Sequence, residues 1–295
     1  GTEMFNTGNT FRRAVIVGVG LMGGSLGLAM KKYGLAKEIV GVSPKQVSLD
    51  LALKYGAIDT GTTSLNEALH HADLVVLATP VETILNIIPS LEEALKRHCI
   101  VTDLGSSKME IVAMAEKRLT RSDFFVGSHP LAGSEKRGVE FATADLFQNA
   151  TCIMTPTEKT NRVAKEKIKH LWTKLGAHVK FLTPQEHDEI LAYVSHLPHL
   201  LSFSLMETVP QKCLEFLTPS LRDTTRIAAS SPQMWNDIFL SNSKSVLKAL
   251  DEAVLQLSIL RKAISIRDSK TLIQHFTQAK EKRSLIDGSS NPTTS

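Results

Sequence analysis

AVIVGVGLMGG, residues 14–24, is the stretch of sequence that decides the fold. Its first four residues form an apolar run typical of a strand. The glycines that follow have the spacing GxGxxG and open a helical pattern that ends near Tyr33. In that context the first glycine permits a tight turn, the second lets the backbone approach a pyrophosphate, and the third lets helix and strand pack closely. The N–H groups at the helix N-terminus then hold the anion. The residues expected to contact a dinucleotide here are Gly18, Gly20, Leu21, Met22 and Gly23.

Short apolar runs alternate with helical patterns through the first 182 residues. The expected strands are residues 14–17, 39–42, 74–78, 100–103, 124–126, 151–154 and 178–181. Strands separated by helices imply βαβ units and a parallel sheet, and right-handed crossovers then favour a doubly wound, Rossmann-type α/β fold. We therefore expect a dinucleotide-binding domain over residues 1–182.

The character of the sequence changes at Thr183, after which no segment has the pattern of a strand. Thr183, Pro184 and Glu186 are typical of a helix start, with an N-cap, a proline at the first helical position and an acid in the first turn. We expect an all-helical domain over residues 183–295. Later in this domain, apolar residues recur at steps of three and four, as in the stripe of a long amphipathic helix. They are Leu247, Leu250, Val254, Leu257, Leu260 and Ile264. A helical bundle or a dimer partner would bury this stripe equally well.

The composition excludes several classes of protein. The formal net charge is +4 and the basic residues are scattered, so we expect no nucleic-acid partner. No apolar run approaches the roughly 18 residues needed to span a membrane, and the first ten residues do not resemble a signal peptide. Cys99, Cys152 and Cys213 are far apart and form no CxxC pattern, which fits reduced thiols in the cytoplasm. His196 and His199 could share a metal ion, but no Cys or carboxylate stands at a spacing that completes a site, so we expect none.

The end of the second expected strand indicates the cofactor. An Asp or Glu about 20 residues after the glycine turn would bind the ribose 2′-hydroxyl of NAD. Here the strand is followed by Ser43, Pro44 and Lys45. A hydroxyl and an ammonium would tolerate or attract the 2′-phosphate of NADP, whereas a carboxylate would repel it. We therefore expect NADP, or use of both NADP and NAD, over strict use of NAD. Ser43 can also be the N-cap of a helix beginning at Pro44, and the two roles are compatible.

Polar segments follow the expected strands at the carboxyl edge of the sheet, where ligands lie in open α/β proteins. Thr79 and Pro80 form a loop on the cofactor side, DLGSSK occupies residues 103–108, and a longer segment that contains His129 occupies residues 127–138. In the helical half, SHLPH at residues 195–199 and the segment at residues 222–235 would fold over these loops and close a cleft between domains.

These segments resemble those of the prephenate/arogenate dehydrogenase family. The resemblance is carried by GVGLMGGSLG (18–27), DLGSSK (103–108), HPLAGSEKRG (129–138), HDEILAYVSHLPH (187–199) and RDTTRIAASSPQMW (222–235). It extends from about residue 12 to about residue 285, and the ordered series is much more specific than any single motif. It implies a dinucleotide-binding domain followed by a helical dimerisation domain, so a homodimer is expected.

The resemblance also implies a reaction, the oxidative decarboxylation of prephenate or arogenate on the route to tyrosine. Hydride leaves the carbinol carbon for the nicotinamide, carbon dioxide leaves the ring, and the ring becomes aromatic. The protein must then supply a group that takes the hydroxyl proton, cationic anchors for carboxylates, and correct placement against the nicotinamide.

Roles for individual residues follow from the same resemblance. His129 would hydrogen-bond and polarise the ring hydroxyl, a role that suits an imidazole titrating near neutrality. Ser106 would hydrogen-bond the same hydroxyl, and Arg226 would bind a substrate carboxylate through its planar fork. Further residues expected to contact the substrate, or the groups that hold it, are His199, Ser134, Glu135 and Trp235.

Each of these residues has a structural alternative. His129 can be an ordinary loop histidine, and Ser106 can be the N-cap of the helix that follows. Arg226 can form a structural ion pair with Asp223. Trp235 is as well placed for the core as for a substrate wall.

Three questions stay open at this point. Prephenate carries a side-chain keto group and arogenate an ammonium, so a carboxylate such as Glu135 nearby would favour arogenate; we expect prephenate and leave the choice open. Two other functions compete: a second type of two-domain dehydrogenase, acting on β-hydroxyacids or imines, and a non-catalytic dinucleotide-sensing module. The segments around His129 and Arg226 argue against both. No chorismate mutase or regulatory domain fits within the chain, so we expect any feedback by tyrosine to act at the active site.

Overall fold

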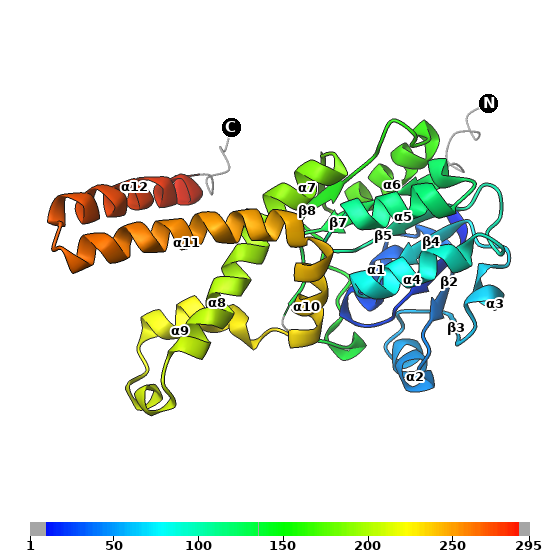
Figure 1. The fold of residues 1–295 in the computed structure, drawn as a ribbon. Helices are drawn as coiled ribbons and strands as arrows, with labels where there is room; N and C mark the ends of the chain where they lie inside the picture. The colour runs from blue at the N-terminus through cyan, green and yellow to red at the C-terminus, as the bar shows by residue number, and fades with distance from the viewer. Residues whose placement is uncertain (1–9, 135, 289–295) are drawn as a thin grey trace, which may run out of the picture. The chain divides into compact units, whose positions relative to one another are not determined.

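Six parallel strands form the central sheet, in the order β3-β2-β1-β4-β5-β6 (Figure 1). The computed structural model describes residues 10–134 and 136–288. The strands are β1 (Phe11–Val17), β2 (Ala36–Val42), β3 (Thr60–Thr62), β4 (Leu74–Leu77), β5 (Ile100–Asp103) and β6 (Phe125–Val126). The connections run outward from β1 in one direction and then from β4 in the other, so the order of strands reverses between β1 and β4. The predicted doubly wound sheet is confirmed, and its switch point is where dinucleotides bind in such folds.

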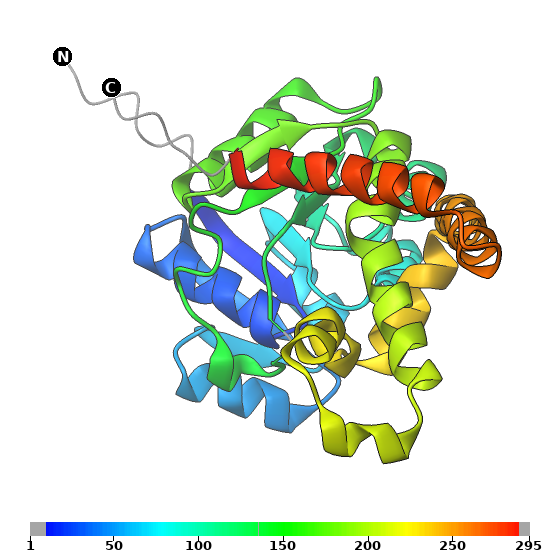
Figure 2. The ribbon, with the colours of Figure 1, turned by 90° about the vertical axis from the view of Figure 1, so that its left-hand side faces the viewer.

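Both faces of this sheet are buried, as the continuous aliphatic runs predict. Along β1 the side chains alternate between two core clusters, with Ala14 and Ile16 in one and Val15 and Val17 in the other. The first cluster is covered by α1 (Leu21–Lys32), α2 (Gln46–Lys54) and α6 (Arg162–Lys174). The second is covered by α3 (Leu65–Leu69), α4 (Val81–Leu91) and α5 (Met109–Arg118). Figure 2 shows the blue and cyan strands of this twisted sheet side by side.

A second, three-stranded sheet stands after β6 and was not expected as a separate unit. Its order is β7-β8-β9, with β7 (Ser128–Pro130) antiparallel to β8 (Thr151–Met154) and β8 parallel to β9 (His178–Phe181). The bounds of β8 and β9 agree with the sequence pattern. Two strands, β3 and β7, were missed because each has only three residues and neither carries an aliphatic run.

Helices alone follow β9 in the described part of the chain, as predicted. They begin with α7 (Pro184–Leu191), a π-helix (Ala192–His196) and α8 (Leu197–Thr208), and continue with α9 (Pro219–Thr225) and α10 (Pro232–Ser241). The start of α7 is confirmed, because the Thr183 hydroxyl accepts from the Glu186 N–H at 3.0 Å and the Glu186 carboxylate accepts from the Thr183 N–H at 3.1 Å. This capping box fixes the chain as it leaves β9.

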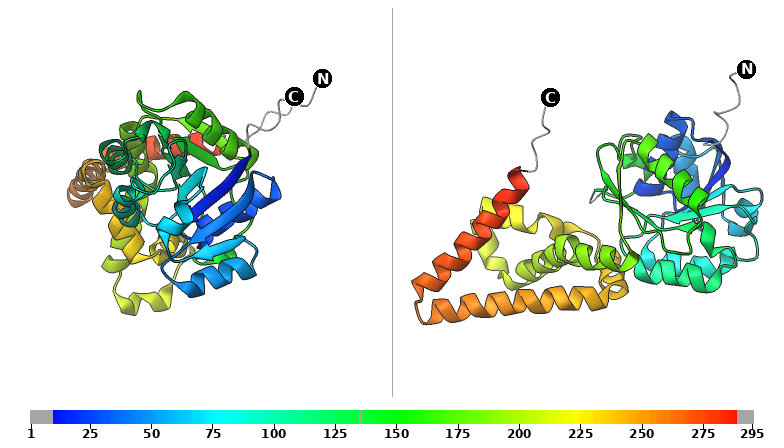
Figure 3. Two further views of the ribbon diagram at one scale, coloured as in Figure 1. Left: turned by 90° about the vertical axis from the view of Figure 1, so that its right-hand side faces the viewer. Right: turned by 90° about the horizontal axis from the view of Figure 1, so that it is seen from above.

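The internal contacts of the chain divide it into two compact units between residues 245 and 246. The second unit holds most of α11 (Ser243–Ser265) and all of α12 (Ser269–Gly288), which diverge from a tight turn (Figure 3). The predicted amphipathic helix is confirmed, but four members of its stripe are more than half exposed: Leu247, Val254, Leu257 and Ile264. None of the described helices combines the length and the apolar character that a membrane span requires.

Candidate active site

The turn between β1 and α1 has the backbone geometry of a dinucleotide site. Gly18 has a φ of 95°, and a Cβ there would lie 2.7 Å from the carbonyl oxygen of Ala78. A Cβ on Gly23 would lie 1.8 Å from the carbonyl oxygen of Gly18, so both positions require glycine. At Gly20 a Cβ would meet no atom within 4 Å, and α1 begins there without a side-chain cap. The N–H groups at this end of α1 are therefore open to a pyrophosphate.

Thr79 and Pro80 follow β4 beside the glycine turn. The methyl group of Thr79 would lie 2.9 Å from a Cβ on Gly18, which shows how closely the two segments approach. The Thr79 hydroxyl is buried and has no hydrogen-bond partner among the described residues. Because a buried hydroxyl without a partner is costly, this group suits a contact to a bound dinucleotide. Pro80 precedes the first residue of α4.

Ser43 and Lys45 lie where β2 ends. Ser43 is 8% exposed, and its hydroxyl accepts a hydrogen bond of 3.2 Å from the Lys45 N–H. Helix α2 begins at Gln46 with Lys45 as its N-cap residue, so the expected helix start at Pro44 with Ser43 as cap is wrong. The Ser43–Lys45 bond closes a turn instead. The hydroxyl proton of Ser43 and the exposed ammonium of Lys45 are left for a ligand.

A buried ion pair lies at the end of β5. Lys108 and Asp103 are both fully buried, and the Lys108 ammonium donates to the Asp103 carboxylate. The same carboxylate accepts from the Gly105 N–H at 2.9 Å and from the Ser128 N–H at 3.3 Å. The hydroxyl of Ser128 bonds to that of Thr102 at 2.8 Å. These contacts tie the DLGSSK turn of β5 to β7.

Ser106 lies on this turn and does not cap the helix that follows. Helix α5 begins at Met109, and the N–H groups of Lys108 and Met109 donate to the two carboxylate oxygens of Asp188 at 2.8 and 3.0 Å. Asp188 belongs to α7, so the cap comes from the helical part of the chain. The alternative role of Ser106 as an N-cap is therefore wrong. Its half-buried hydroxyl has no hydrogen-bond partner in the described ranges and is available to a ligand.

His129 lies in β7 and is not a loop histidine. It is the first of three side chains, His129, His187 and Asp188, that are joined in a row by hydrogen bonds. Its Nδ1 lies 2.7 Å from Nε2 of His187, and Nδ1 of His187 lies 2.7 Å from a carboxylate oxygen of Asp188. His187 and Asp188 are both buried, with exposed fractions of 0% and 1%. A continuous line of hydrogen bonds thus runs from the cap of α5 to the imidazole of His129.

Burial favours the neutral form of both imidazoles in this row. Burial keeps the pKa of His129 well below its usual value, and the Lys108 ammonium acts in the same direction, as would a proton on His187 or His196. Burial also lowers the pKa of His187, although Asp188 opposes the change. A neutral imidazole is the form that can take a proton from a hydroxyl.

Trp235 and two further histidines extend the cluster. The Trp235 ring stacks on His199 with centroids 3.6 Å apart, and meets His196 edge-on with centroids 6.0 Å apart. Nδ1 of His199 donates to the Ser195 carbonyl at 2.8 Å, and its Nε2 has no partner among the described residues. Trp235 is 6% exposed, and its indole N–H has no partner in the described part of the chain. The stack thus combines an imidazole nitrogen and a buried, unpaired donor.

Arg226 starts the short helix Arg226–Ala229, which follows α9. Its side chain is exposed, and the described residues place no carboxylate within ion-pair distance of it, so the ion pair with Asp223 is not formed. The charge of Arg226 affects His199. The pKa of His199 is lowered mainly by burial and also by the positive charge of Arg226. Among the described residues the donors of the guanidinium have no partner, so they are available to a ligand.

One of the predicted residues, Ser134, contributes little to this arrangement. Ser134 is exposed, and its hydroxyl accepts from the Lys136 N–H at 2.9 Å. Glu135 lies outside the described residues.

Two family models match the chain one after the other. The nucleotide-binding domain of prephenate dehydrogenase matches residues 26–181, and the dimerization domain of prephenate dehydrogenase matches residues 183–278. The chain belongs to the prephenate dehydrogenase family.

Individual proteins that are similar to this chain support the same family assignment. A prephenate dehydrogenase of Bacillus subtilis is 37% identical over 91% of this chain and 74% of its own length. A cyclohexadienyl dehydrogenase of Zymomonas mobilis is 33% identical over 92% of this chain and 95% of its own. The crystal structure of prephenate dehydrogenase from A. aeolicus, in complex with hydroxyphenyl propionate and NAD+, has a TM-score of 0.85 at 35% identity and covers 93% of this chain and 98% of its own.

Membership of the prephenate dehydrogenase family confirms the resemblance and its main consequences. The chain is an enzyme, an oxidoreductase with a domain that binds a nicotinamide dinucleotide. The family favours this function over a dehydrogenase for β-hydroxyacids or imines, and over a dinucleotide-sensing module without catalysis.

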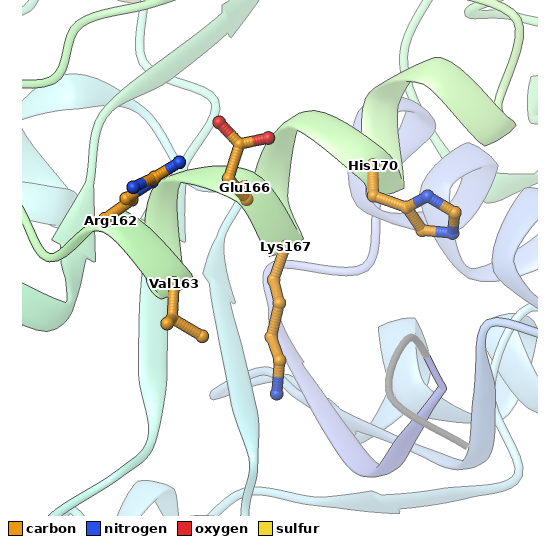
Figure 4. Close-up of a pocket in the computed structure, with 5 residues that line it drawn as sticks. All are labelled: Arg162, Val163, Glu166, Lys167 and His170. Atoms are coloured by element: carbon orange, nitrogen blue, oxygen red, sulfur yellow. The ribbon is translucent and has the colours of Figure 1, made fainter. Parts of the chain in front are cut away.

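A surface hollow elsewhere is not part of this prephenate dehydrogenase site. It is lined by Arg162, Val163, Glu166, Lys167 and His170 (Figure 4). All five residues come from α6, and none of them belongs to the cluster around His129.

Sequence reasoning missed two residues of the site, His187 and Asp188. Both were inside a motif shared with the prephenate dehydrogenase family, but neither had a role. The available signal was the adjacent pair itself, an imidazole next to a carboxylate at the start of a helix. Their significance depends on β7 and α5, which lie about 58 and 79 residues away along the chain.

Proposed function

We propose that this chain catalyses the NAD(P)-dependent oxidative decarboxylation of prephenate, arogenate or both. The observation that carries the proposal is the position of a neutral His129 in β7, next to the end of β5 from which Ser106 follows. Such a group can take the proton of a ring hydroxyl, which oxidation of the carbinol carbon requires.

The reaction balances with the groups that the chain offers. When bound, the oxidised nicotinamide accepts the hydride from the carbinol carbon. The hydroxyl proton goes to Nε2 of His129, and the ring carboxylate leaves as carbon dioxide. The electrons of the broken carbon–carbon bond complete the aromatic ring, and the resulting phenolate oxygen takes the proton back from His129. A hydrogen bond from Ser106 to the same hydroxyl would hold its oxygen in place during proton transfer.

The remaining predicted residues suit substrate binding. Arg226 is exposed and unpaired within the described ranges, so its fork can hold a substrate carboxylate. His199 and Trp235 offer a free Nε2 and a free N–H on one stack, which can bind the polar side chain of the substrate. Ser134 and Glu135, four and five residues after the end of β7 in the sequence, complete the proposed set of substrate contacts. Prephenate is the proposed preference, supported by the name of the Bacillus subtilis relative.

We assign the cofactor preference to NADP or to both NADP and NAD. The support is local: the residue that follows β2 is Ser43 rather than an acid, and the Lys45 ammonium is exposed two residues later. A 2′-phosphate can bond to both groups.

The homodimer is proposed from the exposed stripe of α11. Four large apolar side chains that are more than half exposed on one helix are costly in water, and a second copy of the chain can cover them. The match of residues 183–278 to a dimerization domain supports this. The same match, which follows one that ends at residue 181, supports a domain boundary near residue 182. The free thiols of Cys99, Cys152 and Cys213 support a reducing cytoplasm.

Product analysis tests the proposed reaction. Purified protein is incubated with prephenate or arogenate and with NAD or NADP, in all four combinations. The expected result is equal amounts of reduced nicotinamide, carbon dioxide and 4-hydroxyphenylpyruvate or tyrosine. Absence of product in all four combinations, from folded protein that binds the cofactor, would overturn the proposal.

A further inference from the structure

A partner for His129 is provided by His187, which has no role in the reaction as proposed above. The two rings come from β7 and α7, and meet with centroids 5.0 Å apart at an angle of 65°. Their nitrogens, Nδ1 of His129 and Nε2 of His187, are 2.7 Å apart. Only one of these two nitrogens can carry a proton when both rings are neutral.

The direction of this hydrogen bond is set at Asp188. The carboxylate oxygen of Asp188 can only accept, so Nδ1 of His187 must donate to it. A neutral His187 then has its lone pair on Nε2, and this nitrogen accepts from Nδ1 of His129. The proton of His129 is thereby placed on Nδ1, and its Nε2 carries the lone pair.

We propose that His187 is a positioning residue which fixes His129 in the tautomer that can accept a proton at Nε2. The inference rests on the proposed role of His129 as the group that takes the hydroxyl proton. It adds a specific requirement, namely an acceptor at the position of the His187 Nε2 atom. Without that acceptor, His129 can carry its proton on Nε2, where it blocks proton transfer from the substrate.

Asp188 also caps α5, and this second set of hydrogen bonds keeps its carboxylate in place beside His187. Its two oxygens also accept from the N–H groups of Lys108 and Met109, so the same carboxylate caps α5. The carbonyl of Asp188 accepts in turn from the Asn242 side chain at 2.9 Å. Asp188 is thus held by the start of α5 and by Asn242, which follows α10, and its fixed carboxylate orients the His187 ring. Because changes at Asp188 would also remove the helix cap, His187 is the better position for a test.

The charged surroundings favour two neutral rings. The groups that face His187 are Asp188 on its own helix, Lys108 and Asp103 from the end of β5, His129 from β7, and His196 from the π-helix. Burial lowers the pKa of His187, and the Lys108 ammonium opposes its protonation, while Asp188 and Asp103 favour it. A protonated His187 would donate from Nε2 and could not accept from His129.

Two substitutions separate this role from simple packing. Asparagine at position 187 can place its amide near the Nδ1 atom and donate to Asp188, but it cannot reach His129. Glutamine is longer and can place its amide oxygen near the Nε2 atom, where it accepts from His129. Both variants lose the ring, so a role in packing alone predicts no advantage for glutamine. His178→Gln, at an exposed position in β9, is the matched control for the chemical change.

The test combines kinetics with nitrogen NMR. We expect His187→Asn to lower kcat by about 10²–10³, with KM changed less than about threefold, since a misplaced imidazole proton lowers kcat by about 10⁴ in the serine protease triad. His187→Gln should keep kcat within about tenfold of the unchanged enzyme. In ¹⁵N spectra of the full chain, His129 should be protonated on Nδ1 in the unchanged protein and in His187→Gln, and on Nε2 in His187→Asn.

Each outcome has a clear meaning. Equal kcat values for the asparagine and glutamine variants, or a His129 protonated on Nε2 in the unchanged protein, would overturn the inference. The NMR measurement on the unchanged protein needs neither turnover nor a folded variant. If the unchanged protein fails to convert prephenate or arogenate, the proposed function fails, while the tautomer of His129 still reports on His187.

Discussion

The indole ring of Trp235 lies on the imidazole of His199, with ring centroids 3.6 Å apart and an angle of 19° between the ring planes. The stack joins α10 to α8, and it leaves a buried indole N–H without a partner among the described residues. The Trp235 ring thus stabilises the packing of the two helices, while its indole N–H is available to a ligand. The two properties can be separated by substitution.

Trp235→Phe keeps an aromatic ring but removes the N–H. We expect KM for the substrate to rise about tenfold, because a hydrogen bond to a charged group contributes roughly 1.5–3 kcal/mol. The melting temperature should fall by only a few degrees, whereas Trp235→Ala, which also removes the stack, should lower it much more. Steady-state kinetics and thermal melts of both variants check this. An unchanged KM in Trp235→Phe would show that the N–H does not meet the substrate.

The glycine turn predicts opposite results at two neighbouring positions. A Cβ on Gly23 would stand 1.8 Å from a backbone oxygen, so Gly23→Ala should destabilise the first domain strongly. A Cβ on Gly20 has open space around it, so Gly20→Ala should fold normally and weaken dinucleotide binding by about tenfold, because it obstructs the approach of the pyrophosphate. Melting curves and cofactor titration by calorimetry distinguish the two effects. Normal cofactor affinity in folded Gly20→Ala would mean that the pyrophosphate lies elsewhere.

Cofactor choice is tested at the end of β2. In Ser43→Asp the new carboxylate would repel a 2′-phosphate and accept from a ribose 2′-hydroxyl. We expect kcat/KM with NADP to fall at least tenfold and kcat/KM with NAD to be kept or raised. Lys45→Met should weaken NADP binding alone. A strict preference for NAD in the unchanged enzyme would contradict the interpretation of Ser43 and Lys45.

The buried histidines predict a loss of stability in acid. Burial lowers the pKa of His129, His187 and His196, that of His196 to about 4. Between the usual pKa of about 6.5 and these lowered values the unfolded chain binds more protons, so the free energy of unfolding decreases as the pH falls. For His196 the decrease should begin near pH 6.5 and reach on the order of 3 kcal/mol near pH 4. Urea denaturation of the unchanged protein and of His196→Asn over this range measures it. Identical pH slopes for the two proteins would refute the prediction.

The fold was predictable because its signals are local. The aliphatic runs of β1, β4 and β5 and the glycine spacing at Gly18 to Gly23 identify a doubly wound sheet without reference to the rest of the chain. The site was predictable only in part. Ser106 was an expected N-cap, but the N-cap residue of α5 is Lys108, and Asp188 caps the helix because its carboxylate, remote in sequence, reaches two N–H groups at once. Such pairings depend on tertiary packing, which no local pattern encodes.

The central claim is that His129 takes the hydroxyl proton, and His129→Asn tests it most directly. The measurement compares kcat, KM and cofactor affinity of this variant with those of the unchanged enzyme, using prephenate at pH 7.5. A general base contributes about 10²–10⁴ to the rate, so kcat should fall by that factor while KM and cofactor affinity change less than about threefold. A kcat within about twofold of the unchanged enzyme would contradict the account, because the proton would then leave by a route that does not involve His129.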